Sequence, residues 1–226
     1  VLDMIFVENH SLYALMKGTE GVYPRMPRVM KEEYPASLMM IQETGGLQAG
    51  EVFCDTSLNM TNSHTAAFLL THGARGISFS LESSLQDCSA IKRCFRNDMR
   101  WMHLLYTVYG RAELMLSEYC PINSVICNHT DRNCGLCRQG AEYALLDVKQ
   151  NRYPILCDES CRTHILHYEV RNHIDSIPEA KQHGIQHFLC TFTMEGEADC
   201  HRIITACKAQ LQMKQVYKKR YVIGYT

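Results

Sequence analysis

Cysteine is the residue type whose spacing in this sequence most clearly indicates chemistry. The 226-residue chain contains 12 cysteines, and six of them fall between positions 120 and 161. Cys134 and Cys137 form a Cys-x-x-Cys pair, and Gly135 between them permits the tight turn that lets two thiolates reach one metal. This pair is therefore a candidate for metal coordination.

The same segment offers the further thiols that a complete site requires. Cys120 and Cys127 can supply a second pair, and Cys161 or Cys157 can complete or vary the set. Four thiolates suit a structural zinc ion and an iron–sulfur cluster equally well. Many polar residues surround these cysteines, which argues against a plain apolar core. The other six lie singly on predicted strands or helix faces and are interpreted as core residues: Cys54, Cys88, Cys94, Cys190, Cys200 and Cys207.

Composition narrows the class of protein. Hydrophobic residues make up 46% of the chain and charged residues 21%, an ordinary globular balance that excludes disorder as the dominant state. The net charge of −1 argues against a strongly basic nucleic-acid module. No stretch approaches the roughly 18 apolar residues of a membrane span, and the first residues lack the pattern of a signal peptide. We therefore expect a cytoplasmic protein with reduced thiols and no membrane contact.

Strand and helix patterns alternate along the chain in the rhythm of βαβ units. Strands are predicted at residues 4–7, 51–55, 76–82, 102–108 and 187–192. Helices are predicted at residues 29–43 (apart from Pro35), 64–72, 84–96 and 197–213. This alternation predicts an α/β fold with a parallel sheet.

Polar side chains gather just after these strands, where α/β proteins bind their ligands. Asp55, Asn59 and Asn62 follow one strand and are candidates for substrate binding, although Asn62 fits the N-cap of the next helix better. Glu82 follows the next strand, and Glu118 lies beyond the third. Each glutamate could position a substrate or act as a general acid or base, and each could equally be a hydrogen-bonded loop carboxylate.

One arginine lies directly beside the cysteines. Arg162, next to Cys161, could bind an anionic substrate or donate to cluster sulfur, but a salt bridge is the more common role. The sequence contains no His-x-x-x-His pair beside a Glu, no Gly-x-Ser-x-Gly, no P-loop and no dinucleotide fingerprint. Zinc-protease, serine-hydrolase and nucleotide-binding chemistry therefore find no support in the motifs.

Five segments resemble, in order, the motifs of one protein family. Residues 55–63 resemble its D-x-S-L-N-V-x-N-S strand and loop, and residues 77–82 its V-T-L-S-x-E strand. Residues 109–121 resemble its Y-G-R-x-P-L-M-x-x-E-x-C-P stretch. Residues 134–162 are similar to its cysteine-rich segment, and residues 192–195 to its last D-F-T-x-E strand. The family is the collagenase-like peptidase family, peptidase family U thirty-two.

The resemblance implies a cofactor and two kinds of activity. Well-studied relatives carry a [4Fe-4S] cluster on four cysteines, and the motif would make Cys120, Cys127, Cys161 and either Cys134 or Cys137 the ligands. Some relatives act in oxygen-independent hydroxylation of tRNA, rRNA or the ubiquinone ring, and others are described as proteases that degrade collagen. We expect a modification enzyme acting on RNA or a small aromatic acceptor. The alternatives are a true protease with a peptide substrate and a zinc-stabilised, non-catalytic binding module.

The resemblance also implies a TIM-type (β/α) barrel as the core of the fold. The chain begins near the middle of the family's barrel, so we expect a partial barrel (its second half) with an inserted cysteine-rich loop segment. The expected parts of one structural domain are barrel units at residues 1–119, the cysteine-rich segment at 120–177, and a final βα unit with a tail at 178–226. The N-terminal half of the barrel, or a partner subunit of the same family, would complete it. The family's G-H-x-x-R-G segment is absent near the C-terminus.

Overall fold

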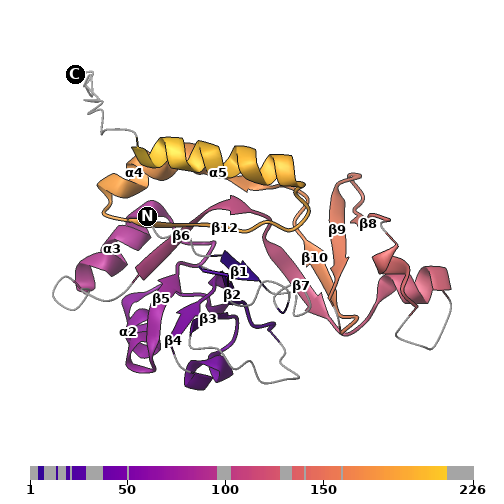
Figure 1. The fold of residues 1–226 in the computed structure, drawn as a ribbon, viewed down its shortest axis with the longest axis horizontal. Coiled ribbons are helices and arrows are strands. Elements are labelled where there is room, and N and C mark those ends of the chain that lie inside the picture. The colour runs from indigo at the N-terminus through magenta and orange to yellow at the C-terminus, as the bar shows by residue number, and fades with distance from the viewer. Residues whose placement is uncertain are drawn as a thin grey trace.

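The fold consists of a mainly parallel sheet with helices against it and a separate antiparallel sheet (Figure 1). The structure is a computed structural model. The described residues are 5–7, 14, 19–20, 22–28, 38–49, 51–95, 103–127, 134–139, 141–158 and 160–212. The mixed α/β class predicted from the sequence is confirmed.

The larger sheet is built from parallel strands that follow one another in chain order. These strands are β3 (Leu38–Ile41), β4 (Glu51–Cys54), β5 (Ala74–Ser78), β6 (His103–Gly110) and β12 (His187–Cys190). A short strand, β11 (Arg171–Asn172), pairs antiparallel with the end of β6. Most residues of β3, β4, β5 and β6 are buried, which is the pattern of a parallel sheet covered on both faces.

A second parallel pair precedes this sheet in the chain. β1 (Ile5–Val7) pairs with β2 (Val22–Pro24), and an isolated bridge between Arg25 and Met40 joins the end of β2 to β3. Among the described residues the path of paired strands remains open, so a closed barrel is not observed.

The helices lie between or across the parallel strands. They are η1 (Thr44–Ala49), η2 (Thr56–Leu58), α2 (Ser63–Thr71), α3 (Leu85–Cys94), η6 (Ile174–Ser176), α4 (Ile177–Gln182) and α5 (Glu197–Gln212). Asn62 caps α2 by accepting from the Thr65 N–H at 2.9 Å, and Ser84 and Asp87 form a capping box at the start of α3. None of the helices in the described part of the chain has the length and apolar character that crossing a membrane requires.

The helix predicted over residues 29–43 is wrong where the structure describes it. Residues 38–41 form β3, and η1 begins at Thr44, while residues 29–37 lie outside the described part. Met39, Met40 and Ile41 are almost completely buried, so the strand is apolar on both faces. A short apolar run of this kind has no periodicity that separates a buried strand from a buried helix turn.

The cysteine-rich segment is also more ordered than the expected loop insertion. It contributes strands to an antiparallel sheet whose order is β7 (Glu113–Ser117), β10 (Thr163–Leu166), β9 (Arg152–Cys157) and β8 (Tyr143–Leu146). The Asp147 carboxylate accepts backbone N–H bonds from Lys149 and Asn151 and so builds the hairpin turn between β8 and β9. In Figure 1 this sheet stands beside the parallel sheet, with β7 and β10 nearer to it.

Candidate functional site

Asp55 lies directly after β4, as predicted, but its carboxylate is already engaged. Its side chain is buried and pairs with the Arg25 guanidinium, whose Nε donates to Oδ2 at 3.1 Å. The other oxygen caps η2 by accepting from the Thr56 N–H at 2.7 Å. Asp55 therefore fixes the loop after β4 and holds Arg25 at the end of the sheet.

The two asparagines have separate roles in the next loop. Asn59 adopts a left-handed conformation (φ 50°) and accepts a hydrogen bond from Ser80 Oγ at 2.6 Å. This contact joins the loop after β4 to the loop after β5. Asn62 serves as the helix cap that the sequence favours.

The two glutamates predicted as acid–base candidates are both exposed. Glu82 lies in the turn after β5, where its backbone N–H donates to Ser80 Oγ at 3.3 Å. Glu118 lies beyond β7, at the entrance to the cysteine-rich segment. Glu82 thus follows β5 of the parallel sheet, whereas Glu118 follows β7 of the antiparallel sheet.

A groove of about 640 Å³ lies where the ends of β3 and β4 face β7. Its polar wall includes Arg28, Gln42 and Ser57, and its apolar wall includes Leu114 and Leu116. The Ser57 hydroxyl donates to the Gln42 carbonyl at 2.7 Å, which fixes the polar wall. Ligands of open α/β sheets bind outside the carboxyl ends of the strands, and this groove has that position. Sequence reasoning missed Gln42 because it fell inside the wrongly predicted helix.

Three thiols from distant parts of the cysteine-rich segment meet in the structure. The thiols of Cys137 and Cys120 lie close enough to the Cys157 thiol to raise its pKa. Burial raises the pKa of Cys157 to about 12, and the two neighbouring sulfurs add to the effect. The Asn123 N–H points at Cys120 Sγ at 3.4 Å. The structure thus places Cys120 and Cys137, two of the predicted ligands, beside Cys157.

The other predicted ligands flank this cluster. Cys134 begins the short turn that carries Cys137, and Cys161 (φ 57°) closes the turn after β9 with its N–H on the Asp158 carbonyl at 3.0 Å. Cys127 ends η4 (Asn123–Cys127), and its side chain lies outside the described part. In the described part of the chain, no three His, Cys, Asp or Glu side chains have a geometry that could hold a metal ion.

A chain of ionisable side chains runs from the groove to the turn that follows Cys157. Arg28 on the groove donates to Glu113 at 2.9 Å, and the other Glu113 oxygen lies 2.8 Å from His164 Nδ1. His164 Nε2 lies 3.7 Å from Asp158 Oδ2, which also accepts from the buried Arg162 at 2.6 Å. Arg162 thus makes the salt bridge that the sequence favoured.

The pKa values of the two carboxyl groups reflect these partners. Burial alone would raise both pKa values, but hydrogen bonds outweigh it. His164 and Arg28 lower the pKa of Glu113, and His164 and Arg162 hold the pKa of Asp158 well below its usual range. Both groups are therefore carboxylates near neutral pH.

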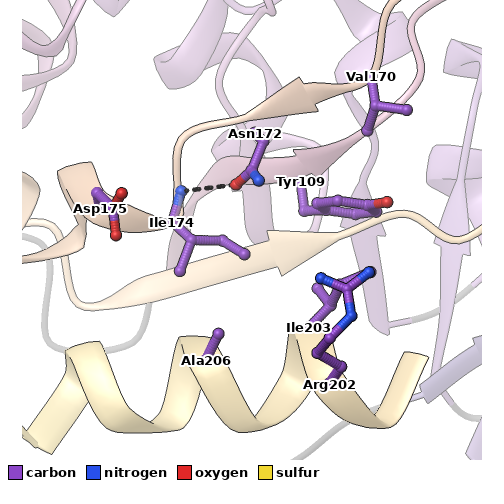
Figure 2. Close-up of a pocket in the computed structure, with 8 residues that line it drawn as sticks. All are labelled: Tyr109, Val170, Asn172, Ile174, Asp175, Arg202, Ile203 and Ala206. Atoms are coloured by element: carbon purple, nitrogen blue, oxygen red, sulfur yellow. Dashed lines mark hydrogen bonds between the residues drawn. The ribbon is translucent and has the colours of Figure 1, made fainter. Parts of the chain in front are cut away.

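A second cavity, of about 380 Å³, lies beneath α5 (Figure 2). Tyr109 of β6 and Arg202 of α5 face it near one end, and Asp175 lies toward the other. The Tyr109 hydroxyl donates to Glu195 at 3.1 Å, and burial together with this bond raises the pKa of Tyr109 to about 12. The cavity is therefore lined by a neutral phenol and by charged groups at its margin.

These features define an α/β protein with a chain-ordered parallel sheet, a groove at the carboxyl ends of its strands and a thiol cluster on an attached antiparallel sheet. Comparison with protein families found a match between residues 35–220 and peptidase family U32. The chain belongs to peptidase family U32, as its motifs predicted. Neither a curated protein nor a solved structure matched it.

Proposed function

We propose that this protein is an iron–sulfur enzyme of peptidase family U32 that modifies RNA or a small aromatic acceptor. The observation that carries the proposal is the contact of the Cys120, Cys137 and Cys157 thiols. These residues come from three separate stretches of the segment, so their meeting is a consequence of the fold. Iron–sulfur clusters are held by cysteine thiolates.

The donor type, sulfur, suits an iron–sulfur group, and the described thiols would have to move closer together to bind one, because no three of them have a metal-holding geometry here. Cys120, Cys137 and Cys157 provide three sulfur donors. No carboxylate is among the groups that raise the pKa of Cys157. The Asn123 N–H on Cys120 Sγ is the type of bond that stabilises a thiolate in such a site. Cys127 and Cys161 are the candidates for the fourth ligand. A bound cluster would supply redox chemistry, and the same thiolates would also suit zinc.

The groove beside β7 is the proposed place for the substrate. Leu114 and Leu116 offer an apolar wall for a ring, and Arg28 offers a guanidinium that can bind a phosphate oxygen. Glu113 orients Arg28 across the groove. The parallel strands follow one another in chain order, which supports the TIM-type arrangement expected for the family.

The test is to purify the protein without oxygen, record its visible spectrum and assay iron, sulfide and zinc together. We expect a brown protein with about four irons and four sulfides that dithionite bleaches. That protein would then be tested for binding and modification of tRNA, rRNA and quinone precursors. A colourless protein with one zinc would contradict the iron–sulfur assignment and support the zinc-stabilised module.

The family match also supports a true peptidase as the second candidate. Hydrolysis of gelatin or collagen peptides by the purified protein would support it. Cleavage that persists when Cys137 and Cys157 are both replaced by serine would separate hydrolysis from chemistry at the thiol cluster.

A further inference from the structure

Two cysteines outside the thiol cluster face each other between β12 and α5. Cys190 is the last residue of β12, and Cys207 lies in the third turn of α5. Their sulfur atoms are 3.6 Å apart, and both are unbridged thiols in the structure. The sequence pattern assigned each of them separately to the core, and only the packing of α5 on β12 brings them together.

The surroundings of the pair favour reaction at one sulfur. Either thiol can donate in this contact, and donation by Cys190 lowers the pKa of Cys207 despite its burial. The same bond and burial raise the pKa of Cys190. Cys207 is therefore the better nucleophile of the two, because the thiolate is the reactive form. Cys190 is only partly buried, so a molecule as small as a peroxide can approach the pair from its side.

We propose that Cys190 and Cys207 are a modification site: they form a reversible disulfide that fastens α5 to β12. The Cys207 thiolate attacks hydrogen peroxide, the O–O bond breaks, and sulfenic acid and hydroxide form. The Cys190 sulfur, losing its proton, then attacks that sulfenic acid, and the S–S bond forms as water leaves. Two thiols and one peroxide thus give one disulfide and two waters, and a dithiol reductant reverses the reaction.

The bond would fix a part of the fold that borders the cavity beneath α5. The loop between β12 and α5 carries Glu195, which accepts from Tyr109 at 3.1 Å, and the Thr191 N–H donates to the Tyr109 carbonyl at 2.9 Å. Ala206, next to Cys207, lines the cavity beneath α5. Oxidation would therefore hold the wall of this cavity in place, independently of any chemistry at the cysteine cluster.

The experiment maps the disulfide in the full chain after brief exposure to peroxide, acid quenching, alkylation and digestion with trypsin. Cleavage after Lys181, Arg202 and Lys208 leaves Cys190 and Cys200 in one peptide and Cys207 in another. The Cys200→Ser variant removes this ambiguity and serves as the matched control on the same helix. In both proteins we expect peptides 182–202 and 203–208 to be joined, and the join to disappear in Cys190→Ser and in Cys207→Ser.

Thermal unfolding gives a second readout. The oxidised Cys200→Ser protein should unfold about 5 °C or more above its reduced form, because the bond closes a loop of moderate length in a chain of this size. The proposal would be overturned if Cys190 and Cys207 still reacted with the alkylating reagent under conditions that oxidise other thiols. A Tm that falls on cross-linking would also overturn it, because the native packing would then not accommodate the bond.

Discussion

Asp55 illustrates how a polar residue at a strand end can serve the structure. Its carboxylate is buried against Arg25 and at the same time caps η2. A buried charge is tolerated only where partners of this kind compensate for lost hydration. The position after β4 therefore needs an acidic residue to hold the loop that borders the groove, whether or not the residue also contacts a substrate.

Replacement of Asp55 by asparagine should lower the free energy of unfolding by about 2 kcal/mol, since the Arg25 charge loses its buried counterpart. Urea unfolding measures the change. Glu51→Gln is the control, because the exposed Arg75–Glu51 pair should contribute less than about 1 kcal/mol. Equal losses in the two variants would contradict the structural role of Asp55.

Cys157 lies beside Cys120 and Cys137 but is not among the ligands implied by the family motifs. If it is a ligand, Cys157→Ser should lose at least half of the bound iron after purification without oxygen, because thiolates hold the cluster. Iron and sulfide assays measure the loss. Cys94→Ser, on the exposed end of α3, is the control.

The same assay on Cys161→Ser distinguishes the two candidates. Full iron content in Cys157→Ser together with loss in Cys161→Ser would return the assignment to Cys161. Cys157 would then be a neighbouring thiol that shapes the surroundings of the cluster.

At the scale of elements, the pairing of β6 with β12 contains a titratable contact. His103 Nδ1 and His187 Nε2 are 2.9 Å apart at the amino ends of the two strands, and the His103 ring stacks on Phe53. A hydrogen bond between two imidazoles requires at least one neutral ring. Burial lowers the pKa of His187, and the neighbouring His103 and Lys92 lower it further.

The pH dependence follows from this lowered pKa. Below about pH 6.5 the unfolded chain binds a proton at His187 more readily than the folded protein does, so stability falls as the pH falls. Above about pH 7.5 both states are neutral there, and the contribution is constant. The Tm of the wild type should therefore drop more between pH 7.5 and pH 5 than that of His187→Gln.

His201→Gln provides the control for this measurement, because His201 is exposed on α5. It should retain the full pH dependence of the wild type. An unchanged pH dependence in His187→Gln would show that the imidazole pair does not contribute.

At the scale of the whole molecule, the groove lies between the parallel sheet and β7 of the antiparallel sheet, and β9 of the antiparallel sheet carries Cys157. Gly110 ends β6 and leads to β7, and its positive φ (138°) and close approach to the Thr191 backbone favour glycine. Arg111 donates to the carbonyls of His167 and Tyr168 beside this crossing. The chain of ionisable side chains from Arg28 to Arg162 is a second link between the groove and the turn after Cys157.

Metal binding should therefore stabilise one sheet selectively. Removing the metal with a chelator under reducing conditions should increase hydrogen exchange in β8, β9 and the turn after Cys157, because free energy of metal binding is also folding free energy. Exchange in β4 and β5 should change little, and these strands are the internal control. A uniform increase over both sheets would contradict a local role for the metal.

Local patterns predicted much of the parallel sheet and several of its helices. β4, α2, α3, β6 and α5 follow from apolar periodicity and from caps such as Asn62 and Ser84, which act within a few residues of their own position. Local patterns failed at β3, where buried methionines have no distinguishing period, and at β8–β10, where the strands are short and their pairing is decided by partners far along the chain. The groove residue Gln42 was missed for the same reason.

The sequence by itself determined the α/β class, the family, the helix caps and the concentration of thiols in one segment, because each depends on residue type and short-range spacing. Only the tertiary structure decided which thiols meet, which carboxylate is buried and that Cys190 faces Cys207. Those outcomes depend on strand pairing and helix packing between residues that are remote in the chain. The energy of such contacts comes from burial and mutual geometry, which the spacing of residues along the chain does not encode.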